Sequence, residues 1–145
     1  MRAVVKVKPM GGQGASHVAR YVAESKLDPG REGGRRPLFS SRENDLAGGD
    51  DQTYRAANRH LTAGRGAPRK RDLIHFSVSF REEDFERLGA NDDERKGRLR
   101  EVTREAMAEI AADLDVGAWR WIAGVHLNTP NPHVHIVIHL SLIHI

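Results

Sequence analysis

Two short apolar runs near the C-terminus, separated by a turn, constrain the fold of this chain more than any other feature. The first run covers residues 119–127, the second covers residues 133–139, and Asn-Thr-Pro-Asn-Pro lies between them. Proline and asparagine favour tight turns, while runs of this length rich in Trp, Val and Ile favour strands. The sequence therefore predicts an antiparallel hairpin formed by these two runs.

Alternation of apolar and polar residues adds two further strands. Residues 2–8 alternate imperfectly and end at Pro9, which predicts a first strand. Residues 73–80 alternate strictly, with an apolar face of Ile74, Phe76, Val78 and Phe80 and a polar face of His75, Ser77 and Ser79. Because successive side chains of a strand point to opposite faces, this segment is predicted to be a half-buried strand with one polar face.

Helical spacing occurs in two segments. Residues 14–26 predict a short amphipathic helix, with Tyr21 on or beside its apolar face. Residues 93–114 predict a long helix whose apolar positions are Leu99, Val102, Ala106, Ile110 and Leu114. The order strand, helix, insert, strand, helix, strand, strand indicates an α+β fold, a mainly antiparallel sheet with helices on one face, which leaves the other face to a substrate.

The segment 27–71 is a long insert rich in Gly, Pro, Ser, Asp and Arg, with one helix-compatible stretch at 52–61. The whole chain has 145 residues, the size of one domain, and 23 Lys+Arg against 20 Asp+Glu. This total charge decides little, but basic residues outnumber acidic ones within the insert. Any nucleic-acid interaction is therefore expected to depend on where the charge is concentrated.

The chain contains no cysteine, which excludes disulfides and thiolate metal sites. No apolar run approaches the ~20 residues of a membrane span, and the N-terminus lacks the apolar region of a signal peptide. We therefore expect a soluble intracellular protein whose metal, if it binds one, is held by His, Asp, Glu, Asn or Gln.

Three histidines are placed to meet on the hairpin. His133 and His135 are separated by one residue, so their imidazoles share a face, and His126 ends the preceding strand across the turn. Three neutral imidazoles suit a divalent metal that keeps open positions for water or a phosphate oxygen. Two alternatives stay open: the histidines form a solvated polar face, or His139, on the same face, is the third ligand.

The stretch from His126 to His135 resembles the three-histidine motif of P-type mobilization relaxases (MobA/VirD-like), which belong to the HUH endonuclease superfamily. The motif of that family is His-x-Asp, four residues, then His-x-His, and here Asn128 stands at the place of the Asp. The resemblance implies that His126, His133 and His135 bind Mg²⁺ or Mn²⁺, with Zn²⁺ as a further option. The cation would polarise the scissile phosphate.

Relaxases also carry a tyrosine near the N-terminus, on or just before a short helix, that attacks the DNA and stays attached to the 5′ end. Tyr21 fits that place, and Tyr54, within the insert, is the other candidate, since the chain has two tyrosines. A phosphotyrosyl bond conserves the energy of the phosphodiester, so the broken strand can be rejoined. The resemblance thus implies Tyr21 as the catalytic nucleophile.

The polar strand at 73–80 resembles the middle motif of the same family, which contacts DNA near the cut; Ser77 and Ser79 could equally be outward-facing strand residues. We expect DNA-binding roles for His75, Ser77, Ser79, Arg69, Lys70 and Arg71. The acidic helical region 82–115 is expected to face away from the DNA.

The resemblance implies a site- and strand-specific single-stranded DNA endonuclease and strand transferase that acts at a plasmid origin of transfer in the bacterial cytoplasm. Its expected partners are this DNA, accessory relaxosome proteins and a coupling protein. A rolling-circle replication initiator of the same superfamily is the nearest alternative, but there the tyrosine follows the histidines, whereas Tyr21 precedes them. A two-histidine phosphoesterase would need a second His-x-Ser/Thr motif. A non-enzymatic, basic nucleic-acid-binding domain would bind no metal.

The relaxase domain is expected to cover residues 1–139. The last six residues, 140–145, match the translation of CTGTCTCTTATACACATC, a sequence similar to the transposon-end adapter of sequencing libraries. We therefore expect 140–145 to be a non-native tail, and the natural chain to continue beyond about His139.

Overall fold

The computed structural model describes residues 3–9, 22, 38–41, 56–57, 59–61, 73–114, 120–127 and 131–139. Its elements are strand β1 (Ala3–Pro9), strand β2 (Leu73–Phe80), helix α4 (Glu82–Glu86), helix α5 (Asp92–Asp113), strand β3 (Trp121–His126) and strand β4 (His133–His139). Val22 and residues 56–57 and 59–61 are also helical. The rest of the helix predicted at 14–26, most of the insert and the tail at 140–145 lie outside the described residues.

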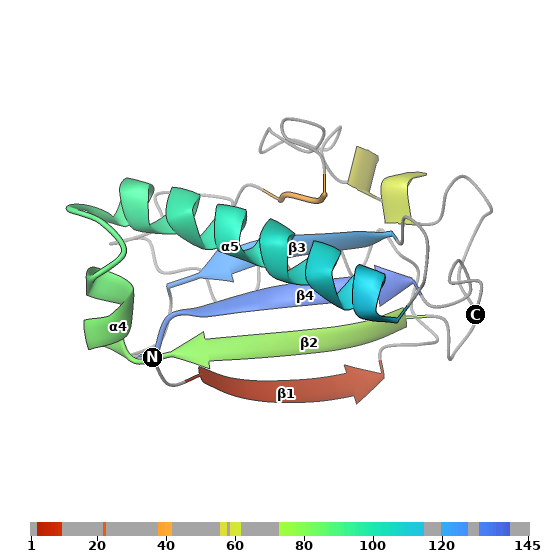
Figure 1. Ribbon diagram of the computed structural model, residues 1–145, viewed down its shortest axis with the longest axis horizontal. Helices are drawn as coiled ribbons and strands as arrows, with labels where there is room; N and C mark the ends of the chain where they lie inside the picture. Colours follow the sequence, from red (N-terminus) through yellow and green to blue (C-terminus); the bar gives the residue numbers. More distant parts are fainter. Residues whose placement is uncertain are drawn as a thin grey trace.

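The four strands form one sheet in the order β1-β2-β4-β3 (Figure 1). All neighbouring strands are antiparallel. The hairpin of β3 and β4 pairs His126 with His133, and β2 pairs with the other edge of β4 so that Ser77 lies opposite His135. The predicted α+β class, with a mainly antiparallel sheet, is confirmed.

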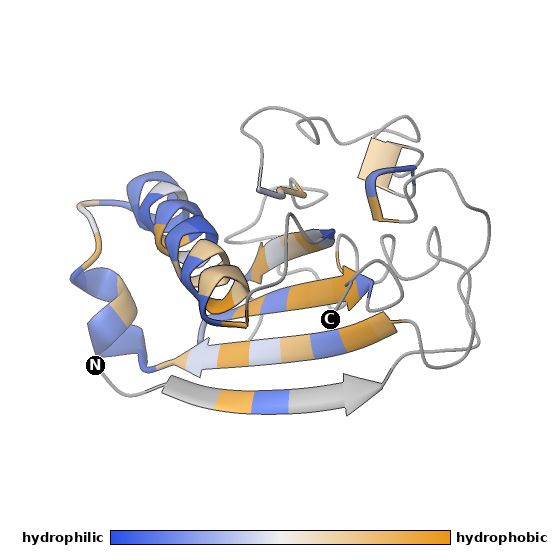
Figure 2. Cartoon of the chain, turned by 45° about the vertical axis from the view of Figure 1, so that its right-hand side comes forward, coloured by the Kyte–Doolittle hydropathy of each residue, from blue (hydrophilic) through white to orange (hydrophobic). Residues whose placement is uncertain are grey.

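Helices α4 and α5 pack on one face of the sheet, and α5 runs lengthwise over β3 and β4 at an oblique angle to the strands (Figure 1). The side chains that meet there are Trp121, Val125, Val134, Ile136 and Ile138 of the sheet with Phe85 of α4 and Leu99 and Met107 of α5. In Figure 2 the apolar residues are concentrated in the strands, whereas the helices are largely polar. This layer of apolar contacts contributes most to stability, because burial of each such side chain is worth about 1.5–3 kcal/mol.

Helix α5 begins at a well-capped end. The side-chain oxygen of Asn91 accepts a hydrogen bond of 2.9 Å from the backbone N–H of Glu94, and the Glu94 carboxylate accepts one of 2.9 Å from the N–H of Ala90. Asp92, Asp93 and Glu94 place negative charge in the first turn, where it interacts favourably with the helix dipole.

The predicted apolar face of α5 is wrong in part. The buried residues are Leu99, Thr103 and Met107, whereas Val102, Ile110 and Leu114 are 40%, 45% and 57% exposed. The Thr103 hydroxyl donates a hydrogen bond of 2.7 Å to the backbone carbonyl of Leu99, so a threonine can be buried without an unsatisfied polar group. The buried face of α5 is therefore formed by every fourth residue, Leu99, Thr103 and Met107. It is rotated about the helix axis relative to the predicted apolar face.

The opposite face of the sheet carries the histidines and a second hydrophobic cluster. Leu73, Ile122 and Val137 of the strands pack there against Val22, Leu38, Ala57 and Leu61. Residues from the N-terminal helix and from the insert thus cover part of this face. Among the helices that the structure describes, none has the length and apolar character needed to cross a membrane.

Candidate metal centre

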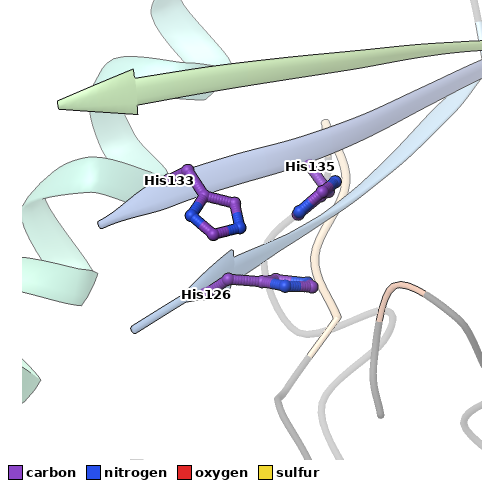
Figure 3. Close-up of side chains that lie close together, drawn as sticks. All are labelled: His126, His133 and His135. Atoms are coloured by element: carbon purple, nitrogen blue, oxygen red, sulfur yellow. The ribbon is translucent and has the colours of Figure 1, made fainter. Parts of the chain in front are cut away.

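His126, His133 and His135 converge on the face of the sheet opposite to α5 (Figure 3). His126 ends β3 and lies opposite His133 in the strand register, and His135 is the next residue of β4 on the same face. The ring centroids are 5.1 Å apart for His126 and His133, 4.0 Å for His126 and His135, and 4.6 Å for His133 and His135. One nitrogen of each ring lies within 4.8 Å of the others, so small ring rotations bring all three to one ion.

Hydrogen bonds to backbone carbonyl oxygens orient two of these imidazole rings. Nε2 of His126 donates to the backbone carbonyl oxygen of Val22 at 2.7 Å, and Nδ1 of His133 donates to that of Asn131 at 3.0 Å. A carbonyl oxygen can only accept, so each bond fixes the tautomer of a neutral imidazole. The lone pair that a metal needs is then on Nδ1 of His126 and on Nε2 of His133. Such bonds from the outer nitrogen are usual for histidines that bind metals.

The set of ligands fits a divalent cation. Two of the imidazoles are buried, with His126 2% and His135 9% exposed, while His133 is half-buried and open to solvent. The described residues of this cluster contain no carboxylate, and imidazole suits Zn²⁺ better than Mn²⁺ or Mg²⁺, which both favour oxygen ligands. Three protein ligands leave coordination positions for water or a phosphate oxygen. His139 is buried but does not belong to the cluster.

Gly124 allows the backbone of Val22 to approach the sheet next to the histidines. A Cβ atom at Gly124 would lie 3.0 Å from Cγ1 of Val22 and 3.2 Å from the Val22 carbonyl oxygen, the same atom that accepts from His126. Sequence reasoning missed this contact. The available signal was a glycine inside a strand, which often marks a close approach of another backbone.

The residues predicted to contact DNA differ in their placement. Ser77 and Ser79 are half-buried on the histidine face of β2, where they lie opposite His135 and His133. His75 is 6% exposed, and its Nε2 lies 2.5 Å from Nδ1 of His135. The acidic helix α5 packs on the other face, as expected. Arg69, Lys70, Arg71 and the two tyrosines, Tyr21 and Tyr54, lie outside the described residues, as does Asn128.

Comparison with known proteins identifies the family. Residues 41–140 match the model of the relaxase family described as MobA/VirD2-like, nuclease domain. That range contains the polar strand and all three histidines and begins after Tyr21. Comparison with curated proteins gives no match.

Among solved structures, the fold is similar to that of the MobM relaxase domain (MOBV; Mob_Pre), whose Mn-bound crystal structure contains plasmid pMV158 oriT DNA. The TM-score is 0.51 and the sequence identity 21%, over 94% of this chain and 67% of that one. The family match extends over more than half of the sequence, from the insert to the end of the metal-binding hairpin. The chain therefore belongs to the MobA/VirD2-like relaxase nuclease family.

Proposed function

We propose that this chain nicks single-stranded DNA at a plasmid origin of transfer and stays attached to it through a tyrosine. The observation that carries the proposal is the convergence of His126, His133 and His135 on the face opposite to α5, in a chain of the relaxase family. A divalent cation bound there would polarise the scissile phosphate and neutralise the charge that develops on its oxygens.

In the proposed reaction the phenolic oxygen of Tyr21 forms a bond to phosphorus and the bond from phosphorus to the 3′ oxygen breaks. The phenol loses its proton to water, and the leaving 3′ oxygen takes one up from water. The products are a 5′-phosphotyrosyl bond and a 3′-hydroxyl, so the reverse reaction can rejoin the strand.

The position of Val22 supports Tyr21 as the nucleophile. The Val22 carbonyl is hydrogen-bonded to His126, a ligand of the proposed metal centre, and Val22 is the residue that directly follows Tyr21 in the sequence. Tyr54 remains the second candidate, because Ala57, three residues further on, is buried in the same cluster as Val22.

We propose that the DNA strand lies over the polar face of β2. Ser77 and Ser79 would contact its backbone next to the histidines, and Arg69, Lys70 and Arg71, which directly precede β2, would neutralise phosphates. Acidic residues of α5 lie on the opposite face of the sheet and would not repel the strand. We place this reaction in the bacterial cytoplasm, with accessory relaxosome proteins and a coupling protein as partners.

The experiment is to incubate the full chain with a labelled single-stranded origin oligonucleotide and Mn²⁺, with a chelator as the control. The expected product is a protein-sized covalent DNA adduct that forms with the metal and not with the chelator. Cleavage without an adduct would show a hydrolytic nuclease instead. DNA binding without cleavage or metal uptake would favour a non-enzymatic DNA-binding domain.

A further inference from the structure

His75 contacts His135, one of the three histidines of the proposed metal centre. It is on β2, two residues before Ser77 and on the same face of the strand. Ser77 is the residue that pairs with His135 in the strand register. Nε2 of His75 is 2.5 Å from Nδ1 of His135, and the two rings are nearly parallel, with 7° between their planes and 4.7 Å between their centroids. His75 is 6% exposed.

The short distance between the two nitrogens limits how protons can be arranged in this pair. Two nitrogen lone pairs repel each other at 2.5 Å, so one of the two nitrogens must carry a proton and donate it to the other. If Nδ1 of His135 is the donor, Nε2 of His135 carries the lone pair and can bind a metal. If Nε2 of His75 is the donor, a neutral His135 carries its proton on Nε2, where it blocks metal binding.

We infer that His75 is a positioning residue that accepts a hydrogen bond from Nδ1–H of His135 and thereby presents Nε2 of His135 to the metal. This inference rests on the proposed metal centre. It completes a pattern in which each ring donates through one nitrogen: His126 to Val22, His133 to Asn131 and His135 to His75.

The choice of an imidazole as the acceptor has a chemical consequence. A carboxylate in this place would add a negative charge beside the cation, whereas a neutral imidazole orients His135 without doing so. The positive charge of the cation then remains available to phosphate oxygens of the DNA. A neutral His75 that accepts from His135, together with three neutral imidazole ligands, therefore suits an enzyme whose substrate is the anionic DNA strand.

The first test determines which imidazole nitrogens of His75 and His135 carry protons in the wild-type protein without metal. Long-range ¹⁵N–¹H NMR spectra of the imidazole rings distinguish the two tautomers, and we expect His135 to be protonated on Nδ1 and His75 to carry its lone pair on Nε2. Protonation of His135 on Nε2 would overturn the inference, whatever the variants do.

The second test compares two substitutions of His75. Leu fills similar space but cannot accept a hydrogen bond, whereas the side-chain oxygen of Gln can. We expect His75→Leu to weaken Mn²⁺ binding by about 10–100-fold in calorimetric titrations, as loss of such partners does, and His75→Gln to restore most of the affinity. Ile74→Val, on the opposite face of the same strand, is the matched control and should bind as the wild type does.

The outcomes separate this inference from the proposed function. Unchanged Mn²⁺ affinity in His75→Leu would overturn the positioning role while leaving the metal centre intact. A wild-type chain that binds no Mn²⁺ would overturn the metal centre and the inference together, even if the NMR spectra place the proton on Nδ1. Equal weakening in His75→Leu and His75→Gln, with unchanged melting temperatures, would also count against the hydrogen bond as the cause.

Discussion

His126 donates a hydrogen bond of 2.7 Å from Nε2 to the backbone carbonyl oxygen of Val22, a residue 104 positions earlier in the chain. The bond joins the hairpin that carries the three histidines to Val22. Gly124, two residues before His126 on the same face of β3, leaves the space that this contact needs. The orientation of a proposed metal ligand and the position of Val22 are therefore coupled through one backbone carbonyl.

Substitution of Gly124 by Ala should impair DNA nicking. The added Cβ would lie 3.0 Å from Cγ1 and 3.2 Å from the carbonyl oxygen of Val22, so Val22 must move by a few tenths of an ångström. Small displacements of reacting groups are costly, and a shift of 1 Å can reduce a rate about 100-fold. We expect the rate of adduct formation to fall at least about tenfold, measured with labelled origin DNA under single-turnover conditions.

Gly97→Ala is the matched control for this experiment. Gly97 lies within α5, and a Cβ there would meet no atom within 4 Å. Because glycine is a poor helix former, the change should stabilise the protein by about 0.5–1 kcal/mol and leave nicking unchanged. Wild-type nicking by Gly124→Ala would show that the contact with Val22 does not position the nucleophile.

Strict alternation made parts of this fold predictable. The strands at 73–80 and 133–139 have the predicted bounds, and alternation predicted Ser77 on the polar face of the first and a shared face for His133 and His135 on the second. The register that sets Ser77 opposite His135 is visible only in the structure. Alternation within a strand does not reveal which segment, far away in the sequence, packs against each face of that strand. The contact of Val22 with Gly124 and the pairing of His75 with His135 both join segments far apart in the sequence, so the local pattern left them hidden.

The face of α5 was mistaken for a different physical reason. A hydroxyl that bonds to its own helix can be buried, so Thr103 occupies a core position that hydrophobicity alone assigns to Val102. Apolar residues also occur singly on protein surfaces without special cause, which weakens an argument from spacing. The helix itself was predictable because its acidic first turn and its length are local features.

Two alanine substitutions in α5 test which face is buried. Leu99 is 2% exposed and Ile110 is 45% exposed. We expect Leu99→Ala to lower the free energy of unfolding by about 2–5 kcal/mol, because it leaves a cavity, and Ile110→Ala to change it by less than about 1 kcal/mol. Urea denaturation followed by circular dichroism measures both. Equal losses in the two variants would mean that α5 buries the face that its sequence spacing predicted.

Removal of two of the three histidines should abolish tight metal binding. Loss of a hydrogen-bond partner alone can weaken affinity about 10–100-fold, so loss of two ligands should do more. We expect His133→Ala combined with His135→Ala to show no calorimetric Mn²⁺ binding in the range where the wild type saturates. His139→Ala tests the alternative ligand on the same strand and should bind normally; a comparable loss there would make His139 a ligand.

Charge in the insert should account for the salt sensitivity of DNA binding. Deletion of 27–71 would remove Leu38 and Leu61 from the core, so substitution of charges is the sharper test. Each phosphate contact on single-stranded DNA contributes about 0.7 to the slope of log affinity against log salt. Replacement of Arg69, Lys70 and Arg71 by Gln should therefore lower the slope by about 2 in fluorescence anisotropy titrations. Arg98→Gln, on the exposed side of α5, is the control, and an unchanged slope in the triple variant would place the DNA elsewhere.

Replacement of Tyr21 by Phe should abolish the covalent DNA adduct. Only the hydroxyl is lost, and the bond between Val22 and His126 uses a backbone carbonyl, so packing and Mn²⁺ affinity should survive. We expect no adduct above background when labelled origin DNA and Mn²⁺ are incubated with Tyr21→Phe, and a wild-type yield with Tyr54→Phe. The opposite pattern would assign the nucleophile to the insert. An adduct in both single variants that disappears in the double variant would mean that either hydroxyl can reach the phosphate. Val22, which directly follows Tyr21 in the sequence, and Ala57, three residues after Tyr54, are buried in one cluster, so both single variants have to be compared.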